Sequence, residues 1–244
     1  MHVLSPGAIA QLGERYTGSV EVRGSIPRSS TMERPPQVTA IHEGLGHILP
    51  PTPTIIEIGA NTGQDTELIL KSCKGSYSYF AFEPDPSALR LLKERRLPIQ
   101  IIESAIGSFN GTTKLYHGYA KNNPGDVDYT VYSSILKPTE FFLKHRIQFS
   151  TEHTVNVIRL DDFAEQHQIE HVDFMWVDIQ GSEFDMIQGG QRTLNSTDWL
   201  YIEVIKQPRY TGEKVEDEVL AALPGNWKIN KRYSYKDILL ERLQ

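Results

Sequence analysis

The residues with the clearest chemical potential form a short glycine-bearing segment between two apolar runs. Residues 55–65 read I-I-E-I-G-A-N-T-G-Q-D, an apolar strand followed by a turn that contains Gly59 and Gly63. A second apolar run, 77–82, ends on the acid Glu83. In open α/β sheets, glycines at such a turn let the backbone approach a nucleoside, and an acid at the next strand's tip accepts hydrogen bonds from the ribose hydroxyls. The spacing therefore predicts a nucleoside site.

The spacing of the two glycines narrows the choice of nucleoside. Dinucleotide-binding turns follow G-x-G-x-x-G and seat a pyrophosphate on the helix N-terminus. Here Gly59 and Gly63 are separated by three residues, and Thr66 stands where a third glycine would be expected. The alternative is an ordinary strand–helix turn with glycines for tight packing, and the placement of Glu83 argues against it.

Acidic residues also stand where other predicted strands end. Glu83, Glu103, Asp178 and Glu203 each follow an apolar run directly. In an open parallel sheet, ligands bind beyond the carboxyl ends of the strands. A carboxylate there is also a good helix N-cap, so capping stays open for each acid taken singly. Their joint occurrence favours a site.

An alternation of strands and helices must position these residues. Asp85-Pro86 favours a helix start, because the carboxylate caps the helix and proline needs no N–H in the first turn. The same preference predicts that Asp161 and Asp162 cap a helix. The predicted strands are 54–58, 77–82, 99–103, 155–160, 174–177 and 199–204, with a closing hairpin at 227–232 and 237–240. The predicted helices are 38–49, 63–72, 86–96, 161–167 and 182–188.

Residues 108–156 have a different composition, rich in Tyr, Asn, Gly, Asp and Ser. The segment is too long for an ordinary connection in a compact sheet. We therefore predict a single domain over 39–244 that carries a substrate-side insertion of short strands and loops at 108–156. Its aromatic and polar side chains are suited to gripping a sugar, although an ordinary solvated loop has the same composition. The residues concerned are Tyr116, Tyr119, Tyr129, Tyr132, Ser133 and Ser134.

Composition limits the possible partners. The 244 residues suffice for one α/β domain with a large core. The formal net charge of −6 argues against a nucleic-acid partner, which rewards clustered Lys and Arg. The single cysteine, Cys73, excludes an internal disulfide framework and a cysteine-based zinc site. We predict no metal.

The N-terminus and the hydropathy pattern bear on location. No run approaches the roughly 18 apolar residues of a membrane span, and the N-terminus lacks the build of a secretory signal. We expect no membrane association and cytoplasmic residence. Residues 1–38 lack periodicity and are expected to form a loose tail. Because residues 7–15 and 24–31 resemble a conceptually translated transfer-RNA gene, we expect the natural start near Met32.

Two stretches resemble a known family. Residues 155–163 read V-N-V-I-R-L-D-D-F, and residues 172–183 read V-D-F-M-W-V-D-I-Q-G-S-E, followed by M-I-Q-G-G at 186–190. They resemble the FkbM family of class I S-adenosylmethionine-dependent methyltransferases. That family has the pattern V-x-x-x-x-L-D-D-F, then an apolar strand ending I-D-x-[EQ]-G-x-E, then L-x-G. Ile187 replaces the usual leucine, and Gln180 replaces the commoner glutamate, which puts in doubt any role that needs a negative charge there.

The resemblance, which spans Ile55 to Val204, implies a fold, a cofactor and site residues. The implied fold is a doubly wound, mostly parallel seven-stranded α/β sheet with a C-terminal antiparallel hairpin, and the implied cofactor is S-adenosylmethionine. Glu83 is expected to hold the ribose hydroxyls and Asp178 to face the sulfonium. The residues implied to bind the cofactor are Glu57, Gly59, Ala60, Asn61, Thr62, Gly63, Glu83, Ser104, Ala105 and Asp178.

Methyl transfer asks little covalent work of the protein, because the sulfonium already makes the methyl group electrophilic. The protein must align an acceptor and help remove its proton. The predicted catalytic residues are Asp178 and Glu203, and His117 or His153 of the insertion are further candidate bases. No Asn-Pro-Pro-Tyr turn, which suits planar amino acceptors, follows the 174–177 strand. We therefore expect a hydroxyl acceptor on a sugar, a glycan or a small secondary metabolite, as the family resemblance also implies.

Two other functions stay open at this point. A nicotinamide-dependent oxidoreductase would use a similar fold, but the missing third glycine argues against it. A catalytically silent nucleoside- or protein-binding module would also preserve the glycine turn and Glu83. Titration with S-adenosylhomocysteine and with NAD separates these possibilities.

Overall fold

The structure is a computed structural model that describes residues 36–120, 130–145 and 147–243. Nearly all of the predicted tail, with the suspected displaced start, lies outside the described residues. The predicted helix at 38–49 is present as α2, Pro36–Ile48, and begins two residues earlier than expected.

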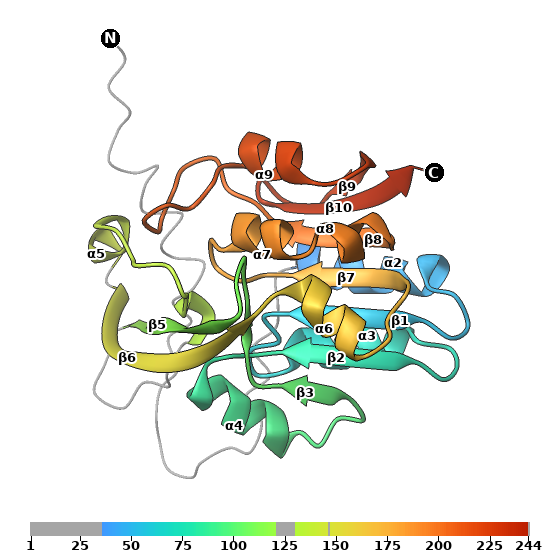
Figure 1. Cartoon of the computed structure of the whole chain (residues 1–244), viewed down its shortest axis with the longest axis horizontal. Coiled ribbons are helices and arrows are strands. Elements are labelled where there is room, and N and C mark those ends of the chain that lie inside the picture. The colour runs from blue at the N-terminus through green and yellow to red at the C-terminus, as the bar shows by residue number, and fades with distance from the viewer. Residues whose placement is uncertain (1–35, 121–129, 146, 244) are drawn as a thin grey trace. The chain divides into compact units, whose positions relative to one another are not determined.

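A seven-stranded sheet is the main element of the described chain (Figure 1). Its strand order is β3-β2-β1-β7-β8-β10-β9. The first five of these strands are parallel, whereas β10 is antiparallel to both β8 and β9. The predicted mostly parallel sheet with a closing hairpin is confirmed. The bounds are β1 Thr54–Ile58, β2 Ser78–Phe82, β3 Gln100–Ile102, β7 Val172–Val177, β8 Thr197–Glu203, β9 Asn226–Arg232 and β10 Asp237–Leu243.

Helices cover both faces of this sheet, because successive strand side chains point to opposite sides. In β1, Ile55 belongs to an apolar cluster with Ile41 of α2 and Ile69, whereas Ile56 belongs to a second cluster with Leu160. Burial on both sides explains the continuous apolar runs of the sequence. The other helices of this layer structure are α3 Gln64–Ser72, α4 Pro86–Glu94, α6 Leu160–Gln166, α7 Glu183–Gly189, α8 Gln191–Asn195 and α9 Glu216–Ala222.

The region predicted as an insertion contributes most of a second sheet (Figure 1). This sheet has the order β4-β6-β5, formed by Ala105–Ile106, Ile147–Ile158 and Gly111–Ala120 respectively. The strands β5 and β6 span 10 and 12 residues, so the expectation of short strands was wrong. The strand predicted at 155–160 is only the end of β6. Between the two strands lie the short helices η2, Thr130–Tyr132, and α5, Phe141–Lys144.

The capping prediction at the start of α6 needs a correction. Arg159 is the N-cap residue of α6, and no side-chain hydrogen bond caps that helix. Asp161 instead accepts hydrogen bonds from the backbone N–H groups of Arg192, at 3.1 Å, and Thr193, at 2.9 Å. Asp161 is therefore a capping residue, but of α8. The partner lies 31 residues away, which local sequence could not reveal.

Across the described ranges, no helix combines the length and the apolarity that crossing a lipid bilayer requires.

Candidate functional site

The turn after β1 is held between the ends of β2 and β7. The N–H groups of Gly59 and Ala60 both donate to the carbonyl of Phe82 at 3.0 Å, while Asp178 N donates to Ile58 O at 3.0 Å. Gly59 has φ 92°, and a Cβ at this position would lie 1.9 Å from the carbonyl oxygen of Asp178. Only glycine fits this close backbone approach.

The remainder of the turn repeats the left-handed conformation. Asn61 has φ 48° and Gly63 has φ 81°. Asparagine tolerates this region better than most residues, and a Cβ at Gly63 would lie 2.6 Å from Leu92 Cδ1. The carbonyl of Thr62 accepts a hydrogen bond from Arg95 Nε. The residue types of the sequence motif are therefore the ones that this backbone needs.

Glu83 lies at the tip of β2 beside this turn. Its Oε2 accepts from Asn61 N and its Oε1 from Asp85 N, both at 2.7 Å. The side chain is buried, and burial raises the pKa of Glu83 to about 8, with the negative charge of Asp85 adding to the rise against the two N–H donors. Every partner of this carboxylate is a backbone N–H. The predicted ribose acid thus directly adjoins the glycine turn.

Glu57 lies within β1, beneath the turn. Its Oε2 accepts from Thr66 Oγ1 at 2.6 Å and from the Tyr79 hydroxyl at 2.8 Å. The residue is fully buried. These bonds hold the first turn of α3 and β2 against β1, which supports the conformation of the turn.

Ser104 and Ala105 follow β3 at the same edge of the sheet as Glu83. Both are buried, and Ser104 N donates to Ile102 O at 2.9 Å. Glu83 N donates to the same carbonyl at 3.1 Å, which places the tips of β2 and β3 side by side. Glu103 differs from the other tip acids, because it is exposed and forms a surface ion pair with Lys93 at 2.6 Å. The expectation that it lines the site is not met.

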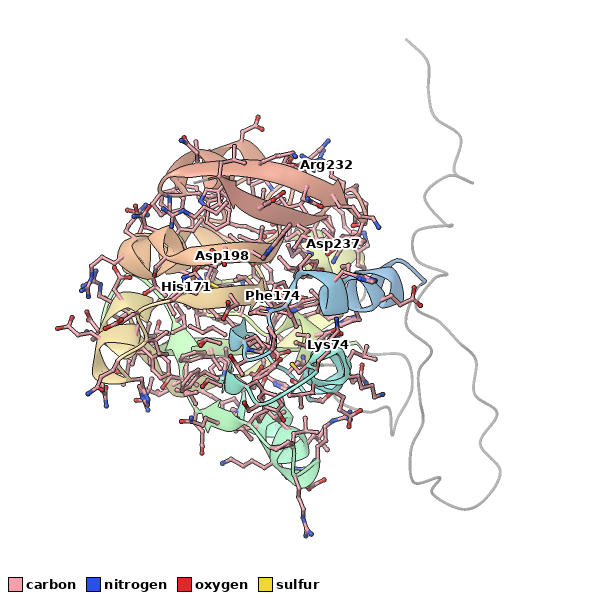
Figure 2. The ribbon with its side chains drawn as sticks, turned by 90° about the vertical axis from the view of Figure 1, so that its right-hand side faces the viewer. Lys74, His171, Phe174, Asp198, Arg232 and Asp237 are labelled. Atoms are coloured by element: carbon pink, nitrogen blue, oxygen red, sulfur yellow. The ribbon has the colours of Figure 1, made fainter. Side chains whose placement is uncertain are left out.

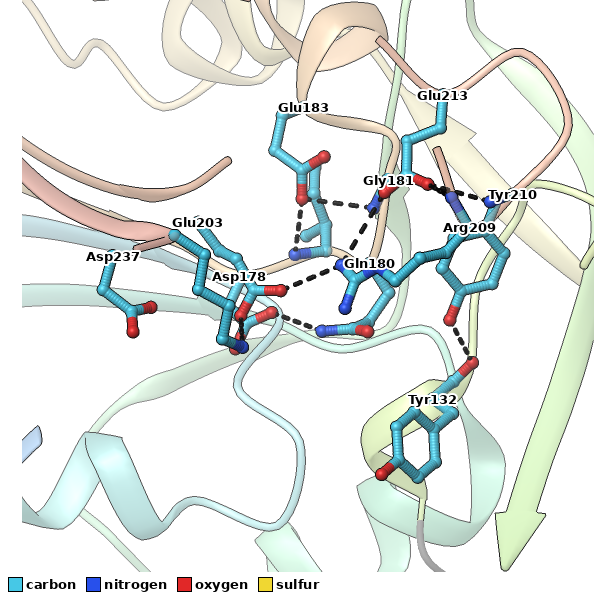
Figure 3. A network of polar contacts seen from close by, with 12 residues as sticks. Tyr132, Asp178, Gln180, Gly181, Glu183, Glu203, Arg209, Tyr210, Glu213 and Asp237 are labelled. Atoms are coloured by element: carbon cyan, nitrogen blue, oxygen red, sulfur yellow. Dashed lines mark hydrogen bonds and ion pairs between the residues drawn. The ribbon is translucent and has the colours of Figure 1, made fainter. Parts of the chain in front are cut away.

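Asp178 and Gln180 occupy the turn after β7, on the other side of the glycine turn (Figure 3). Gln180 Nε2 donates to Asp178 Oδ1 at 2.7 Å. Burial raises the pKa of Asp178 to about 6, and the negative charge of Glu203 adds to the rise. Gln180 has φ 53°, an unusual backbone conformation for a residue with a long side chain. Asp178 is therefore a buried carboxylate that is ionised at neutral pH.

Glu203, at the tip of β8, is held by two cations (Figure 3). Arg209 Nη2 lies 2.9 Å from Oε1, and Lys236 Nζ contacts Oε2. Burial alone would raise the pKa of Glu203, but Lys236 and Arg209 outweigh it and the pKa is lowered. Both oxygens are engaged, so this carboxylate is a poor proton acceptor. Its geometry fits an ion-pair role better than the predicted role as a base.

The loop after β8 joins this network to the second sheet. Glu213 accepts from the N–H groups of Arg209 and Tyr210, and the Tyr210 hydroxyl donates to Tyr132 O at 2.8 Å (Figure 3). Tyr210 also packs with Phe142 of α5 in a small apolar cluster. Arg209 is thus fixed from both ends, and the loop fastens the insertion to the sheet edge.

Asp85 has two roles, of which the sequence predicted one. As predicted, it caps α4, because its Oδ1 accepts from Ser87 N at 2.8 Å. Its Oδ2 lies 2.7 Å from both His117 Nδ1 and Ser133 Oγ. Burial would raise the pKa of Asp85, but these two partners outweigh it and the pKa is lowered. The candidate base His117 is therefore buried against Asp85, and the His153 ring lies 6.2 Å from its ring centroid.

Several site residues escaped the sequence reasoning because their partners are remote. Ser133 meets Asp85 across 48 residues and Lys236 meets Glu203 across 33. Lys236 could have been found only from the pairing of β10 with β8, in which Asp237 lies opposite Glu203. Arg209 carried no signal of its own.

One group of possible metal ligands lies away from the glycine turn. His171 Nε2 is 3.1 Å from Asp198 Oδ2 and 3.6 Å from Asp173 Oδ1. These residues stand at the amino ends of β7 and β8, opposite the carboxyl edge that carries Asp178 (Figure 2). Asp173 also accepts from Thr54 N at 2.7 Å. The cluster is therefore too remote to act at the glycine turn.

Comparison with known proteins gives consistent results. Residues 57–236 match the family model described as "Methyltransferase FkbM domain". The chain is similar to the 2-O-methyltransferase NoeI of Sinorhizobium fredii (strain NBRC 101917 / NGR234), with 30% identity over 199 residues that cover 79% of this chain and 80% of that protein.

Two solved structures are similar in fold. One is the methyltransferase FkbM from Methylobacillus flagellatus KT, at 14% identity and a TM-score of 0.48 over 82% of this chain. The match spans half of that longer protein. The other is an rRNA methylase from Streptococcus thermophilus, at 11% identity and a TM-score of 0.46 over 88% of this chain and all of that one.

Proposed function

The chain belongs to the FkbM family of S-adenosylmethionine-dependent methyltransferases, and we propose that it methylates a hydroxyl oxygen of a sugar, a glycan or a small secondary metabolite. The observation that carries this proposal is the position of the glycine turn, between the carboxylates of Glu83 and Asp178. A nucleoside at the turn would meet one acid on its ribose side and the other on its far side.

The residues at the turn fit the cofactor. An ionised carboxylate offers about four acceptor positions, and Glu83 uses one on each oxygen for backbone N–H groups. The remaining positions suit the two ribose hydroxyls, which are donors. The turn itself lacks the glycine pattern that a pyrophosphate needs. Ser104 and Ala105 stand at the neighbouring strand tip, where they would flank the adenine.

The chemistry divides between cofactor and protein. S-adenosylmethionine supplies an electrophilic methyl group on its sulfonium. Asp178 is ionised near neutral pH and is held by Gln180, so it can accept the proton of an acceptor hydroxyl or orient the amino group of the cofactor. Glu203 stays paired with Arg209 and Lys236 and maintains the shape of this side of the site.

The acceptor class follows from three considerations. The relative with 30% identity is named as a 2-O-methyltransferase, which supports oxygen as the accepting atom. The net charge of −6 disfavours an RNA acceptor, since polyanions bind through clustered cations. The second sheet, with Tyr116 and Tyr132, brings aromatic and polar side chains beside the carboxyl edge of the main sheet.

The test is a panel of hydroxylated sugars, glycans and metabolites incubated with methyl-labelled S-adenosylmethionine. We expect label on at least one hydroxyl compound and none on the analogue that lacks that hydroxyl. Label that persists on the deoxy analogue, or that appears only on amines, would contradict an oxygen acceptor. Titration with S-adenosylhomocysteine and with NAD should give heat only with the first.

A further inference from the structure

Two adjacent serines of the second structural unit reach the two sides of the glycine turn. Ser133 Oγ donates to Asp85 Oδ2 at 2.7 Å, and Ser134 Oγ donates to the carbonyl of Gln180 at 2.7 Å. Asp85 follows the end of β2 by three residues, and Gln180 follows the end of β7 by three. We call Ser133 and Ser134 together the serine clasp.

The strand order fixes where the serine clasp lies. β1 stands between β2 and β7, and neighbouring strands are about 4.8 Å apart, so β2 and β7 are separated by roughly 10 Å. Two consecutive residues, about 3.8 Å apart at Cα, can span this gap when their side chains extend in opposite directions. The clasp therefore crosses the carboxyl end of β1, where the turn at 59–63 would hold the cofactor.

Each serine is linked by one further residue to an acid that faces the turn. Asp85, which Ser133 contacts, donates its N–H to Glu83 Oε1 at 2.7 Å. Gln180, which Ser134 contacts, donates its side-chain amide to Asp178 Oδ1 at 2.7 Å. The clasp thus joins two acids that share no direct contact.

The clasp is itself held by elements outside the cofactor side. Ser134 exchanges backbone hydrogen bonds with Tyr116 of β5, at 2.8 and 3.2 Å. Tyr132 O, directly before the clasp, accepts from the Tyr210 hydroxyl (Figure 3). Ser134 is 2% exposed, so its hydroxyl is not a solvated surface group. The left-handed backbone of Gln180 is also held on both sides, by Ser134 at its carbonyl and Asp178 at its side chain.

We propose that Ser133 and Ser134 are positioning residues, which fix Glu83 through Asp85 and Asp178 through Gln180 and thereby make cofactor binding depend on the acceptor-side sheet. This inference rests on the proposed function, since it assigns the turn to the cofactor. The two hydroxyls act on different acids, so their effects should be separable.

The test is a set of double-mutant cycles read by the dissociation constant of S-adenosylhomocysteine, measured calorimetrically on the whole chain. Ser133→Ala should weaken binding about three- to tenfold, the loss of one net hydrogen bond's worth of free energy. The same substitution in a Glu83→Ala background should have little further effect, because its path to the ligand is already cut. Ser134→Ala with Glu83→Ala should instead be additive.

Two controls separate positioning from general stability. Ser87→Ala keeps the backbone N–H that Asp85 accepts and should leave the dissociation constant unchanged. Ser133→Thr keeps a hydroxyl and should restore binding that Ser133→Ala loses. A purely structural role would lower the midpoint of thermal unfolding without changing the affinity of the folded protein.

The outcomes distinguish the clasp from the proposed function. The clasp is overturned when the wild-type protein binds S-adenosylhomocysteine and both serine variants bind it equally well, or when Ser133→Ala and Glu83→Ala are additive. The proposed function fails independently, when the wild-type protein binds S-adenosylhomocysteine and transfers no methyl group to any hydroxyl of the panel.

Discussion

Glu83 and Glu203 are buried carboxylates at the tips of two strands of one sheet, yet their surroundings differ in kind. Glu83 is 6% exposed and Glu203 is 3% exposed. Glu83 receives only backbone N–H groups, and burial raises its pKa to about 8. Glu203 is paired with Arg209 and Lys236, and although burial opposes the change its pKa is lowered.

The difference teaches how to tell a ligand-facing acid from a structural one. A buried carboxylate without a cation is costly unless something else supplies donors. Glu83 keeps acceptor capacity that neutral hydroxyl donors can use, whereas Glu203 has its charge compensated inside the protein. Position at a strand tip made the two look alike in the sequence, and the partners separate them.

The largest expected effect is on catalysis, at Asp178. Asp178→Asn should reduce the rate of methyl transfer about 10²- to 10⁴-fold, the usual range for losing a general base. Because the pKa of Asp178 is about 6, the wild-type rate should also fall as the pH drops below 6, when the carboxylate becomes protonated. The measurement is single-turnover transfer of labelled methyl to the best hydroxyl compound of the panel.

The matched control for this prediction is Asp217→Asn, an exposed carboxylate in α9. It should leave the rate and its pH profile unchanged. If Asp178→Asn transferred methyl at the wild-type rate, Asp178 would have no part in proton removal and the two sides of the turn would be alike.

The next effect is on stability, at Glu203. Glu203→Gln leaves Arg209 and Lys236 with an uncompensated positive charge, and removing one partner of a buried ion pair costs about 3–5 kcal/mol. We expect a fall of that size in the free energy of unfolding, measured by urea denaturation. Affinity for S-adenosylhomocysteine under folding conditions should change little.

Glu103→Gln is the contrasting variant, because Glu103 forms an exposed pair with Lys93. Such pairs contribute about 0–1 kcal/mol. Equal losses from Glu203→Gln and Glu103→Gln would show that the ion pairs at the tip of β8 are not structural.

A smaller effect is expected on cofactor affinity, at Glu83. Glu83→Ala should weaken binding of S-adenosylhomocysteine by about 1–3 kcal/mol, the value of one or two hydrogen bonds to a charged group. Calorimetric titration measures this directly, with Glu103→Ala as the control at the tip of the neighbouring strand. Unchanged affinity in Glu83→Ala would remove Glu83 from the site.

The predicted parts of the fold were those with a local signal. Continuous apolar runs marked β1 and β7, and left-handed positions demanded the glycines at 59 and 63. Helix capping by Asp85 was likewise written in neighbouring residues. These features depend on interactions within a few positions of the chain.

The features that escaped prediction depend on distant pairing. The first eight residues of β6, at 147–154, were not recognised as a strand, because their polar alternation gains meaning only against β5, which lies about 35 residues away. The contacts of Asp85 with His117 and Ser133 cross 32 and 48 residues. Sequence alone could therefore place the turn and its acids, but not the second sheet that closes over them.

The smallest expected effect is the pH dependence of cofactor affinity. An acid whose pKa rises from about 4.5 in the unfolded chain to about 8 in the folded protein keeps its proton between these values only when folded. The ribose hydroxyls donate to the ionised form, so Glu83 must release that proton on binding. Affinity for S-adenosylhomocysteine should therefore rise with pH toward 8, by at most about tenfold per pH unit, and level off above it.

Titrations at pH 6.5, 7.5 and 8.5 measure this rise, and the range stays above the pKa of Asp178, which is about 6. In Glu83→Ala the same series should be flat, because the proton that couples to binding is gone. The opposite sign applies to folding: the free energy of unfolding contributed by Glu83 falls as pH rises through this window, since the native state holds the extra proton. An affinity that fell with pH in the wild-type protein would mean that the cofactor binds the protonated acid, and the contrast between Glu83 and Glu203 would then be one of charge at rest rather than of charge in the complex.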